Sequence, residues 1–345
     1  MPSHTEAYRL RDMSLLWQLQ DPVLLLRLFY LAASALIFVI QAVPALRSRF
    51  LAYGSRATPP SSQSSDASKK QEPSAVVQAL DHLASLRVPH RWFTHFYVVS
   101  VACSVLWGIQ MWRTLSISPV YKYYPSWEVG ISYMSMGQIQ LAWLLMLLQG
   151  VRRLVESYQY TSSSKSQMWF GHYILGILFY VTVNMAIWVE GPCNFWHVGC
   201  HGAFVQENDR MVLAKPLDNL NGFVQKHQWK VACLVPAILT AHALQHMYHA
   251  YLYRLRTETA TYQLPSHPMF PNLLCPHYTC EIAIYLLLSF LAAPTGSPMN
   301  WTLLCATVFV TVNLGVTASG TKEWYVQRFG ADKVETRNRM ILWLW

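Results

Sequence analysis

Long apolar runs recur along the chain and alternate with shorter polar segments. Each run comes close to the roughly 17 to 25 residues that a helix needs to cross the hydrocarbon core of a bilayer. The runs lie at about residues 22–42, 94–112, 132–151, 169–189, 228–249, 279–294 and 300–318. The pattern predicts an all-α integral membrane protein with about seven transmembrane helices.

The composition supports a membrane protein, and the basic residues orient it. The 345 residues are 53% hydrophobic and 12% charged, whereas soluble proteins carry about 25% charged residues. With the N-terminus outside, the predicted inner segments hold 17 Lys and Arg residues and the outer segments hold 7. Because basic residues favour the cytosolic side, we expect a lumenal N-terminus and a cytosolic C-terminus. This topology accounts for the net charge of +9, so no nucleic-acid partner is expected.

The polar segments indicate how the chain is organised. Residues 1–54 form an N-terminal segment that contains the first predicted transmembrane helix. Residues 55–75 are rich in Ser, Pro and Gln, which predicts a disordered cytosolic insertion. Residues 76–345 hold the remaining six apolar runs and form the membrane core.

One polar segment, "CNFWHVGCHG", brings four side chains of metal-ligand type into a short stretch predicted to be lumenal. They are Cys193, His197, Cys200 and His201. Their spacing matches no standard zinc finger. A disulfide between Cys193 and Cys200, two unpaired thiols and a metal site all stay open as interpretations.

A polar stripe lies at the end of the fifth apolar run, in "AHALQHMYHAYLYRLR". At 100° per residue, its polar side chains fall within about 60° of one helix face. They are His242, Gln245, His246, His249, Tyr253 and Arg256. The histidines suggest a metal, and the arginine suggests an anionic cofactor. Because the other histidines are isolated, whereas membrane di-iron enzymes need several histidine clusters, we favour the cofactor and predict no bound metal.

Further polar groups lie in or beside apolar runs, where burial is costly and therefore suggests function. Arg153 and Glu156 are three residues apart on one helix face, and His277 and Glu281 are four apart. Asn313 is the main strongly polar group inside the last run. The structural alternatives are a solvated ion pair for the first two residues and a neutral buried acid for Glu281. Since the chain has no P-loop and no GxGxxG after a strand, neither a Walker nor a Rossmann site is expected.

Several motifs occur in order from about residue 88 to the end of the chain. They are "VPHRWFTHFY" (88–97), "RRLVES" (152–157), "LQHMYHAYLYRLR" (244–256), "YQLP" (262–265), "CPHYTCEIAIYLLLSF" (275–290), Asn313 and "EWYVQRF" (323–329). In this order they resemble the polyprenol/polyprenal reductase branch of the steroid 5-alpha-reductase family. The ordered set is specific, although any one motif alone would be weak.

The resemblance implies a seven-helix enzyme of the endoplasmic reticulum membrane. Such an enzyme uses NADPH to saturate the α-isoprene double bond of a polyprenyl lipid, on the route to the dolichol used in protein N-glycosylation. It implies an NADPH-binding part at about 228–345, and Glu156 and Glu281 as catalytic positions. The implied cofactor-binding positions are Arg153, Gln245, His249, Arg256, His277, Asn313, Tyr325 and Arg337.

The chemistry of hydride transfer narrows the choice between the two candidate substrates, polyprenal and polyprenol. A nicotinamide hydride adds readily to a double bond when a conjugated carbonyl takes up the developing charge. A free allylic alcohol offers no such group, so we favour polyprenal over polyprenol as the species reduced. Hydride would reach the β carbon, a donor would hold the enolate oxygen, and a proton would then reach the α carbon. His95 and Tyr97 are candidates for polarising the oxygen or delivering the proton, with an interfacial structural role as the alternative.

Three other functions stay open. Within the same family, the chain would be a steroid or enoyl-thioester reductase. Outside it, the histidine stripe would serve a metal-dependent lipid hydroxylase or desaturase, or the chain would be a non-catalytic membrane scaffold or transporter.

Overall fold

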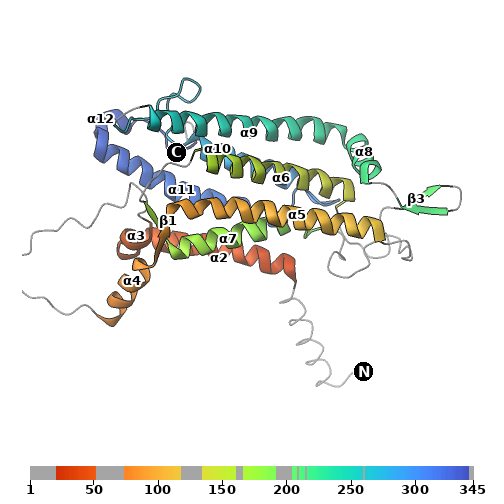
Figure 1. The fold of residues 1–345 in the computed structure, drawn as a ribbon, viewed down its shortest axis with the longest axis horizontal. Coiled ribbons are helices and arrows are strands. Elements are labelled where there is room, and N and C mark those ends of the chain that lie inside the picture. Colours follow the sequence, from red (N-terminus) through yellow and green to blue (C-terminus); the bar gives the residue numbers. More distant parts are fainter. Residues whose placement is uncertain are drawn as a thin grey trace, which may run out of the picture.

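The structure is a computed structural model, and it describes residues 21–51, 74–117, 134–160, 166–191, 204–207, 210–213, 216–258 and 261–341. Seven long helices run side by side in one bundle (Figure 1). They are α2 (Pro22–Ala42), α5 (Thr94–Ile117), α6 (Met136–Gln159), α7 (Phe170–Ala186), α9 (Gln228–Thr257), α10 (Pro276–Leu291) and α11 (Trp301–Phe329). Each coincides with one of the seven apolar runs, which confirms the mostly helical architecture.

Successive long helices run in opposite directions, so that α2, α6, α9 and α11 end where α5, α7 and α10 begin (Figure 1). Segments in four of these helices are long and apolar enough to cross a membrane, namely Pro22–Ala42, His90–Arg113, Gln228–Thr257 and Trp301–Phe329. The structure is therefore consistent with a membrane protein. Seven crossings, a lumenal N-terminus and a cytosolic C-terminus stay predictions.

Side-chain caps fix where several of these helices begin. The Asp21 carboxylate accepts a hydrogen bond from the backbone N–H of Val23 at 2.9 Å, and Pro22 occupies the first turn of α2. Asn300 caps α11 in the same way, with its Oδ1 atom 2.8 Å from the N–H of Leu303. Such caps satisfy backbone donors that have no partner within the helix.

Three helices extend beyond the predicted apolar runs. The runs end at about 151, 249 and 318, whereas α6, α9 and α11 continue to Gln159, Thr257 and Phe329. The last turns are polar, so hydropathy alone cannot detect them. In the extended parts of α6 and α11, Glu156 and Glu323 pair with arginines.

Short elements connect the long helices. The strands β1 (Arg87–Pro89) and β2 (Gln167–Trp169) pair antiparallel, with Val88 opposite Met168. The others are α3 (Pro44–Phe50), α4 (Ala75–Ser85), the 3-10 helix η2 (His90–Phe93), β3 (Phe204–Glu207), β4 (Arg210–Leu213), α8 (Pro216–Lys226) and α12 (Ala331–Val334). One end of the bundle carries α3, α4, β1 and α12, and we call it the α12 end. The opposite end carries α8 and β3 (Figure 1).

Apolar side chains occupy both the core and the outer surface of the bundle. Tyr30, Ile139 and Leu288 are fully buried within one continuous hydrophobic cluster. Leu106 and Trp112, by contrast, are 64% and 63% exposed on the outer face of α5. An apolar exterior around an apolar core is expected where lipid rather than water surrounds the helices.

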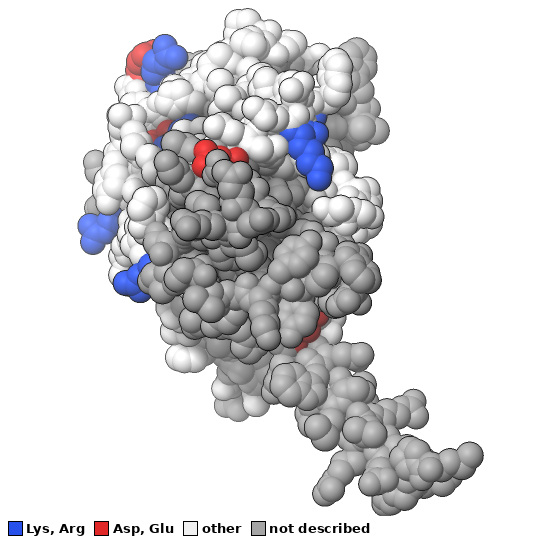
Figure 2. All heavy atoms as spheres, turned by 90° about the vertical axis from the view of Figure 1, so that its right-hand side faces the viewer, with Lys and Arg blue, Asp and Glu red and all other residues white. Residues whose placement is uncertain are grey.

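The α8 end carries few charges on its described surface. Figure 2 views this end directly and shows isolated Lys, Arg, Asp and Glu side chains among uncharged ones. The described residues at this end therefore form no charged patch.

Two sequence predictions concern residues that lie largely outside the described ranges. Most of the predicted disordered insertion, residues 55–73, is not described, while Ser74 and Ala75 cap and begin α4. Cys193 and Cys200, with His197 and His201, also lie outside the described residues. The disorder and the state of these cysteines stay predictions.

Candidate active site

A cavity of about 290 Å³ lies between the helices in the half of the bundle nearer the α12 end. Six of the long helices line it: α5, α6, α7, α9, α10 and α11. Seven of the twelve predicted site residues contribute to its wall. They are Tyr97, Arg153, Gln245, His249, His277, Glu281 and Asn313. The fold thus brings together residues that are far apart in the sequence.

Polar and apolar side chains line the cavity from largely different helices, and we call them its polar and apolar walls. The polar residues come mainly from α6, α9 and α10, whereas α7 and α11 contribute mostly apolar ones. The apolar lining includes Leu175, Gly176, Phe179, Phe309, Val310 and Leu314. Such a cavity can hold a ligand with a polar group at one end and hydrocarbon at the other.

Gly176 allows two helices to approach closely at the edge of this cavity. A Cβ atom built on Gly176 would lie 2.6 Å from Cζ of Phe96. Phe96, on α5, is buried and also lines the cavity. The shape of the cavity on the α5–α7 side therefore depends on the absence of a side chain at Gly176.

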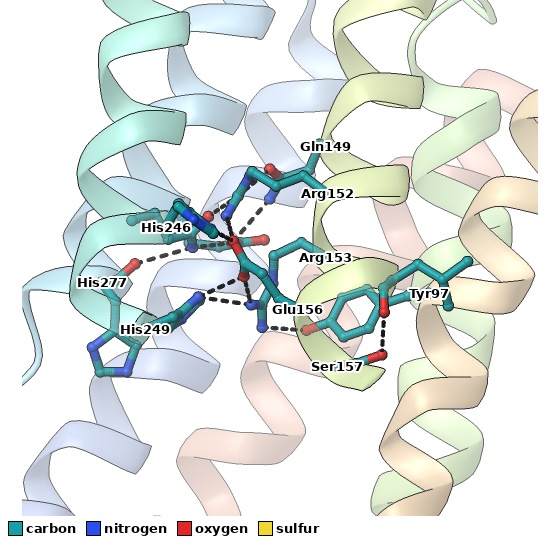
Figure 3. A network of polar contacts seen from close by, with 12 residues as sticks. Tyr97, Gln149, Arg152, Arg153, Glu156, Ser157, His246, His249 and His277 are labelled. Atoms are coloured by element: carbon teal, nitrogen blue, oxygen red, sulfur yellow. Dashed lines mark hydrogen bonds and ion pairs between the residues drawn. The ribbon is translucent and has the colours of Figure 1, made fainter. Parts of the chain in front are cut away.

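Glu156 is the centre of an ion network between α6 and α9 (Figure 3). Its side chain is only 2% exposed. Arg152 donates to Oε1 at 2.5 Å, and Arg153 donates to Oε2. Nδ1 of His246 lies 2.8 Å from Oε1, and Nδ1 of His249 lies 2.8 Å from Oε2. Because an ionised carboxylate only accepts hydrogen bonds, His246 carries its hydrogen on Nδ1 when it donates to Glu156. Nη1 of Arg153 also lies 2.7 Å from Nδ1 of His249, so this nitrogen contacts both a donor and the carboxylate.

Glu156 does not itself line the cavity. Arg153 and His249 stand between its carboxylate and the cavity, and both contribute to the polar wall. Glu156 can therefore hold these two side chains in place, but it does not reach a ligand in the cavity. The sequence prediction that Glu156 is catalytic stays untested, and the geometry favours a positioning role.

Arg152 links this network to Glu281 through two glutamines. One guanidinium nitrogen, Nη2, donates to Oε1 of Gln149 at 2.7 Å and to Oε1 of Gln245. Since both amide oxygens are taken, the amide nitrogens point the other way, and both donate to Oε2 of Glu281. The Gln149 bond is 3.0 Å long. A buried chain of hydrogen bonds thus fixes the orientation of Glu281, which does line the cavity.

Tyr97 is held by a direct hydrogen bond from Arg153. Nη2 of Arg153 donates to the Tyr97 hydroxyl oxygen at 2.6 Å, and the tyrosine is only 2% exposed. Arginine is a donor only. The Tyr97 hydroxyl hydrogen is therefore left to donate to another group.

His95 lies away from the cavity. Its side chain is exposed, and Nδ1 is 3.1 Å from the hydroxyl of Tyr173 on α7. It is not among the residues that line the cavity. Of the two candidates for oxygen polarisation, the structure brings only Tyr97 to the polar wall.

The remaining three predicted cofactor residues gather at the α12 end of the bundle. Arg256 is exposed in the last turn of α9, and Tyr325 packs beside Phe329 near the end of α11. Arg337 follows α12, and its Nη1 atom donates to the backbone oxygen of Pro265 at 2.5 Å. None of the three lines the cavity.

The polar stripe of α9 faces α6 over most of its length. Gln245, His246 and His249 bond to α6 side chains, and Tyr253 packs on Tyr160 with ring centroids 5.1 Å apart. The prediction of a single polar face is thereby confirmed. Within the described part of the chain, no group of three or more His, Cys, Asp or Glu side chains is arranged to hold a metal ion.

Sequence patterns alone do not identify the residues that connect the network around Glu156 to its partners on other helices. Arg152 is adjacent to Arg153, but nothing in the local spacing identifies its bond to Gln245, which is 93 residues further along the chain. Gln149 lies in an apolar run, where its polarity was a usable signal. His246 was part of the stripe, but its partner Glu156 could not be inferred from α9 alone.

Comparison with known proteins gives matches over most of the chain. A family model described as 3-oxo-5-alpha-steroid 4-dehydrogenase matches residues 217–345. The chain is 25% identical to Polyprenal reductase 2 of Oryza sativa subsp. indica over 283 residues, which cover 71% of this chain and 76% of the relative. It is 27% identical over 266 residues to Polyprenal reductase 1 of Arabidopsis thaliana, covering 70% and 77%.

A human protein, Polyprenal reductase, is 23% identical over 260 residues, which cover 70% of this chain and 73% of the relative. The family model spans α9, α10 and α11, and so includes Gln245, His249, His277 and Glu281 of the polar wall. Tyr97 and Arg153 lie outside the matched segment and reach the same wall from α5 and α6.

Proposed function

We propose that this chain belongs with the polyprenal reductase branch of the steroid 5-alpha-reductase family and that it reduces polyprenal with NADPH. Its similarity to polyprenal reductases and the family match over residues 217–345 support this proposal. The bond saturated is the double bond of the α-isoprene unit, next to the aldehyde. One observation carries the proposal: one cavity is lined by hydrogen-bonding side chains mainly from α6, α9 and α10 and by hydrocarbon mainly from α7 and α11. An aldehyde with an isoprenoid chain has the same division.

Tyr97 supports reduction of a double bond that is conjugated to a carbonyl. When hydride reaches the β carbon, negative charge develops on the carbonyl oxygen, and a donor aimed at that oxygen lowers the barrier. The Tyr97 hydroxyl, whose oxygen is already held by Arg153, has its hydrogen left for this purpose. The nearby guanidinium also stabilises negative charge at that position. Proton delivery to the α carbon then completes the reduction, and Tyr97 is our candidate for this step as well.

NADPH would supply the hydride, and the polar wall has groups suited to its nicotinamide end. Nδ1 of His277 is buried and has no hydrogen-bond partner among the described residues. A bound ligand would give this atom a hydrogen-bond partner, which buried polar groups nearly always have. Gln245, His249 and Asn313 would complete this part of the site, while Arg256, Tyr325 and Arg337 at the α12 end would hold the phosphate-bearing end.

The bundle also suits a substrate that stays in the bilayer. A polyprenyl chain is too long for a cavity of about 290 Å³, so only its head would enter while the tail remains in lipid. Phe179, Phe309 and Leu314 on the apolar wall would contact the first isoprene units. The endoplasmic reticulum and the pathway to dolichol follow as the proposed setting.

The purified protein tests the proposal directly. Polyprenal and NADPH together should yield oxidised cofactor and the α-saturated aldehyde, whereas polyprenol should give no turnover. A cell line that lacks the protein should accumulate polyprenyl species and lose dolichols. Turnover of a steroid enone without turnover of polyprenal would contradict the proposal.

Reduction of a steroid enone is the second candidate, because the matching family model is described as a steroid dehydrogenase. Enones and enals share the conjugated carbonyl that accepts hydride, so the polar wall suits both. The two differ in the tail that the apolar wall must accept. Competition between polyprenal and a steroid enone for the same purified protein would decide which substrate is preferred.

A further inference from the structure

The short helix α4 presents an apolar face that no described residue covers. It has no buried residue, and Val76 and Leu83 are 68% and 47% exposed. Residues seven apart in an α-helix lie within about 20° of one another around its axis. Leu86, immediately after the helix, is 42% exposed. The three side chains therefore form one apolar surface, the α4 face.

The position of α4 is fixed by contacts in its C-terminal half. Nε of Arg49 on α3 lies 2.6 Å from Oδ1 of Asp81. Two residues further along, the indole N–H of Trp169 donates to the backbone oxygen of Leu83 at 2.8 Å. The N–H of Phe170 donates to the oxygen of Leu86 at the same distance. The α4 face is thus held at the start of α7, at the α12 end of the bundle.

The surroundings of the α4 face are basic. Arg87 and Arg91 follow the helix directly, and both are exposed. Asp81 is the acidic residue of α4, and its charge is paired with Arg49. An apolar helix face bordered by arginines complements the boundary of a bilayer that contains anionic lipids. Figure 1 also shows α4 inclined to the long helices, as a helix lying along a membrane surface would be.

We propose that α4 lies in the interface of the same membrane that the long helices cross. The α4 face enters the boundary between headgroups and acyl chains, while Arg87 and Arg91 contact anionic headgroups. Asp81 and His82, which lie on the other side of the helix, face water. The inference does not depend on the enzymatic activity, because it concerns a surface outside the cavity.

Fluorescence quenching in reconstituted vesicles tests this arrangement. The full chain carrying Leu83→Cys or Val76→Cys is labelled with an environment-sensitive fluorophore, and His82→Cys serves as the matched control. The parent chain, which has seven cysteines of its own, is labelled in parallel to give the background. The vesicles contain phosphatidylcholine and phosphatidylserine. One quencher is a nitroxide on a lipid acyl chain, and the other is aqueous iodide.

The nitroxide lipid should quench labels at 76 and 83 at least about threefold more than the label at 82, and iodide should show the reverse order. Equal quenching by iodide at all three positions would overturn the proposal. Shielding of residues 76 and 83 from both quenchers would also overturn it, because protein would then cover the face. Vesicles without phosphatidylserine should give weaker lipid quenching at 83, and an unchanged value would contradict the role of the two arginines.

Discussion

We propose the Tyr97 hydroxyl as the donor to a bound carbonyl, because Arg153 donates to its oxygen and an arginine cannot accept its hydrogen. Replacing Tyr97 by Phe removes the hydroxyl group, and with it the hydrogen bond from Arg153, but keeps the ring. We expect kcat for polyprenal to fall roughly a hundredfold, as when one oxyanion donor is removed, with KM for NADPH unchanged. Tyr173→Phe is the control, since the hydroxyl of this tyrosine contacts His95 and the residue does not itself line the cavity. A larger loss from His95→Ala would reverse the assignment.

Glu156 should matter for stability as well as for activity. Its carboxylate lies between two guanidinium groups and is almost fully buried. Glu156→Gln removes the negative charge and leaves Arg152 and Arg153 facing each other, so it should destabilise the fold by about 3–5 kcal/mol. Glu323→Gln breaks an exposed ion pair with Arg47 and should cost less than about 1 kcal/mol. Unfolding by denaturant in detergent compares the two variants, and equal losses would argue against a central role for the buried network.

Substitution of Arg256 should distinguish cofactor binding from substrate binding. It is exposed at the α12 end, outside the cavity that would hold the aldehyde. Arg256→Ala should therefore weaken NADPH binding by roughly tenfold or more, the cost of one charge-assisted contact, and change the KM for polyprenal little. Titration of the purified variant with NADPH measures the first effect. An equal loss for cofactor and aldehyde would contradict the phosphate assignment.

Single residues were predictable from the sequence where their polarity conflicted with an apolar setting. Gln245, Glu281 and Asn313 stood out in this way, and all three line the cavity. Gln149 carried the same signal but was not among the predicted residues, and Arg152 carried none, because its partner Gln245 lies on α9. The pairing of polar groups depends on helix packing, which hydropathy does not encode.

The approach of α5 to α7 depends on Gly176. Gly176→Ala places a methyl group against the Phe96 ring, so the ring must move within the cavity wall. We expect a severalfold rise in KM for polyprenal, because overpacking a tight contact displaces its neighbours. Gly222→Ala on α8 is the control, since its added Cβ meets no atom within 4 Å. An unchanged KM for polyprenal in both variants would contradict this prediction, because the cavity wall would then tolerate the movement of the Phe96 ring.

At the level of helices, the apolar runs located all seven long elements but not all of their ends. The run in α9 stops near residue 249, yet the helix continues to Thr257. The missed turn carries Tyr253, which packs on Tyr160 after α6. The short strands β1 and β2 were not predicted either. Each has three residues, and pairing across about 80 intervening residues leaves no local pattern.

The alternating directions of the long helices fit a chain that crosses the membrane seven times. N-glycosylation acceptor sites introduced into either predicted loop would test this in microsomes. A site in residues 55–75 should stay unmodified, because that segment is predicted to be cytosolic. A site in residues 192–203 should be glycosylated, because that segment is predicted to be lumenal. The opposite pattern would invert the proposed orientation and remove the cytosolic position of Arg256.

The ion network around Glu156 also has a consequence for the order of biosynthesis. Arg152 and Arg153 lie four and three residues from Glu156, so these pairs form as soon as α6 is helical. His246 is 90 residues further along the chain and is made later by the ribosome. The newly inserted α6 therefore already contains the counter-ions of Glu156 before α9 is synthesised. The histidines of α9 then bond to a carboxylate that is already paired with two arginines, rather than to an unpaired carboxylate.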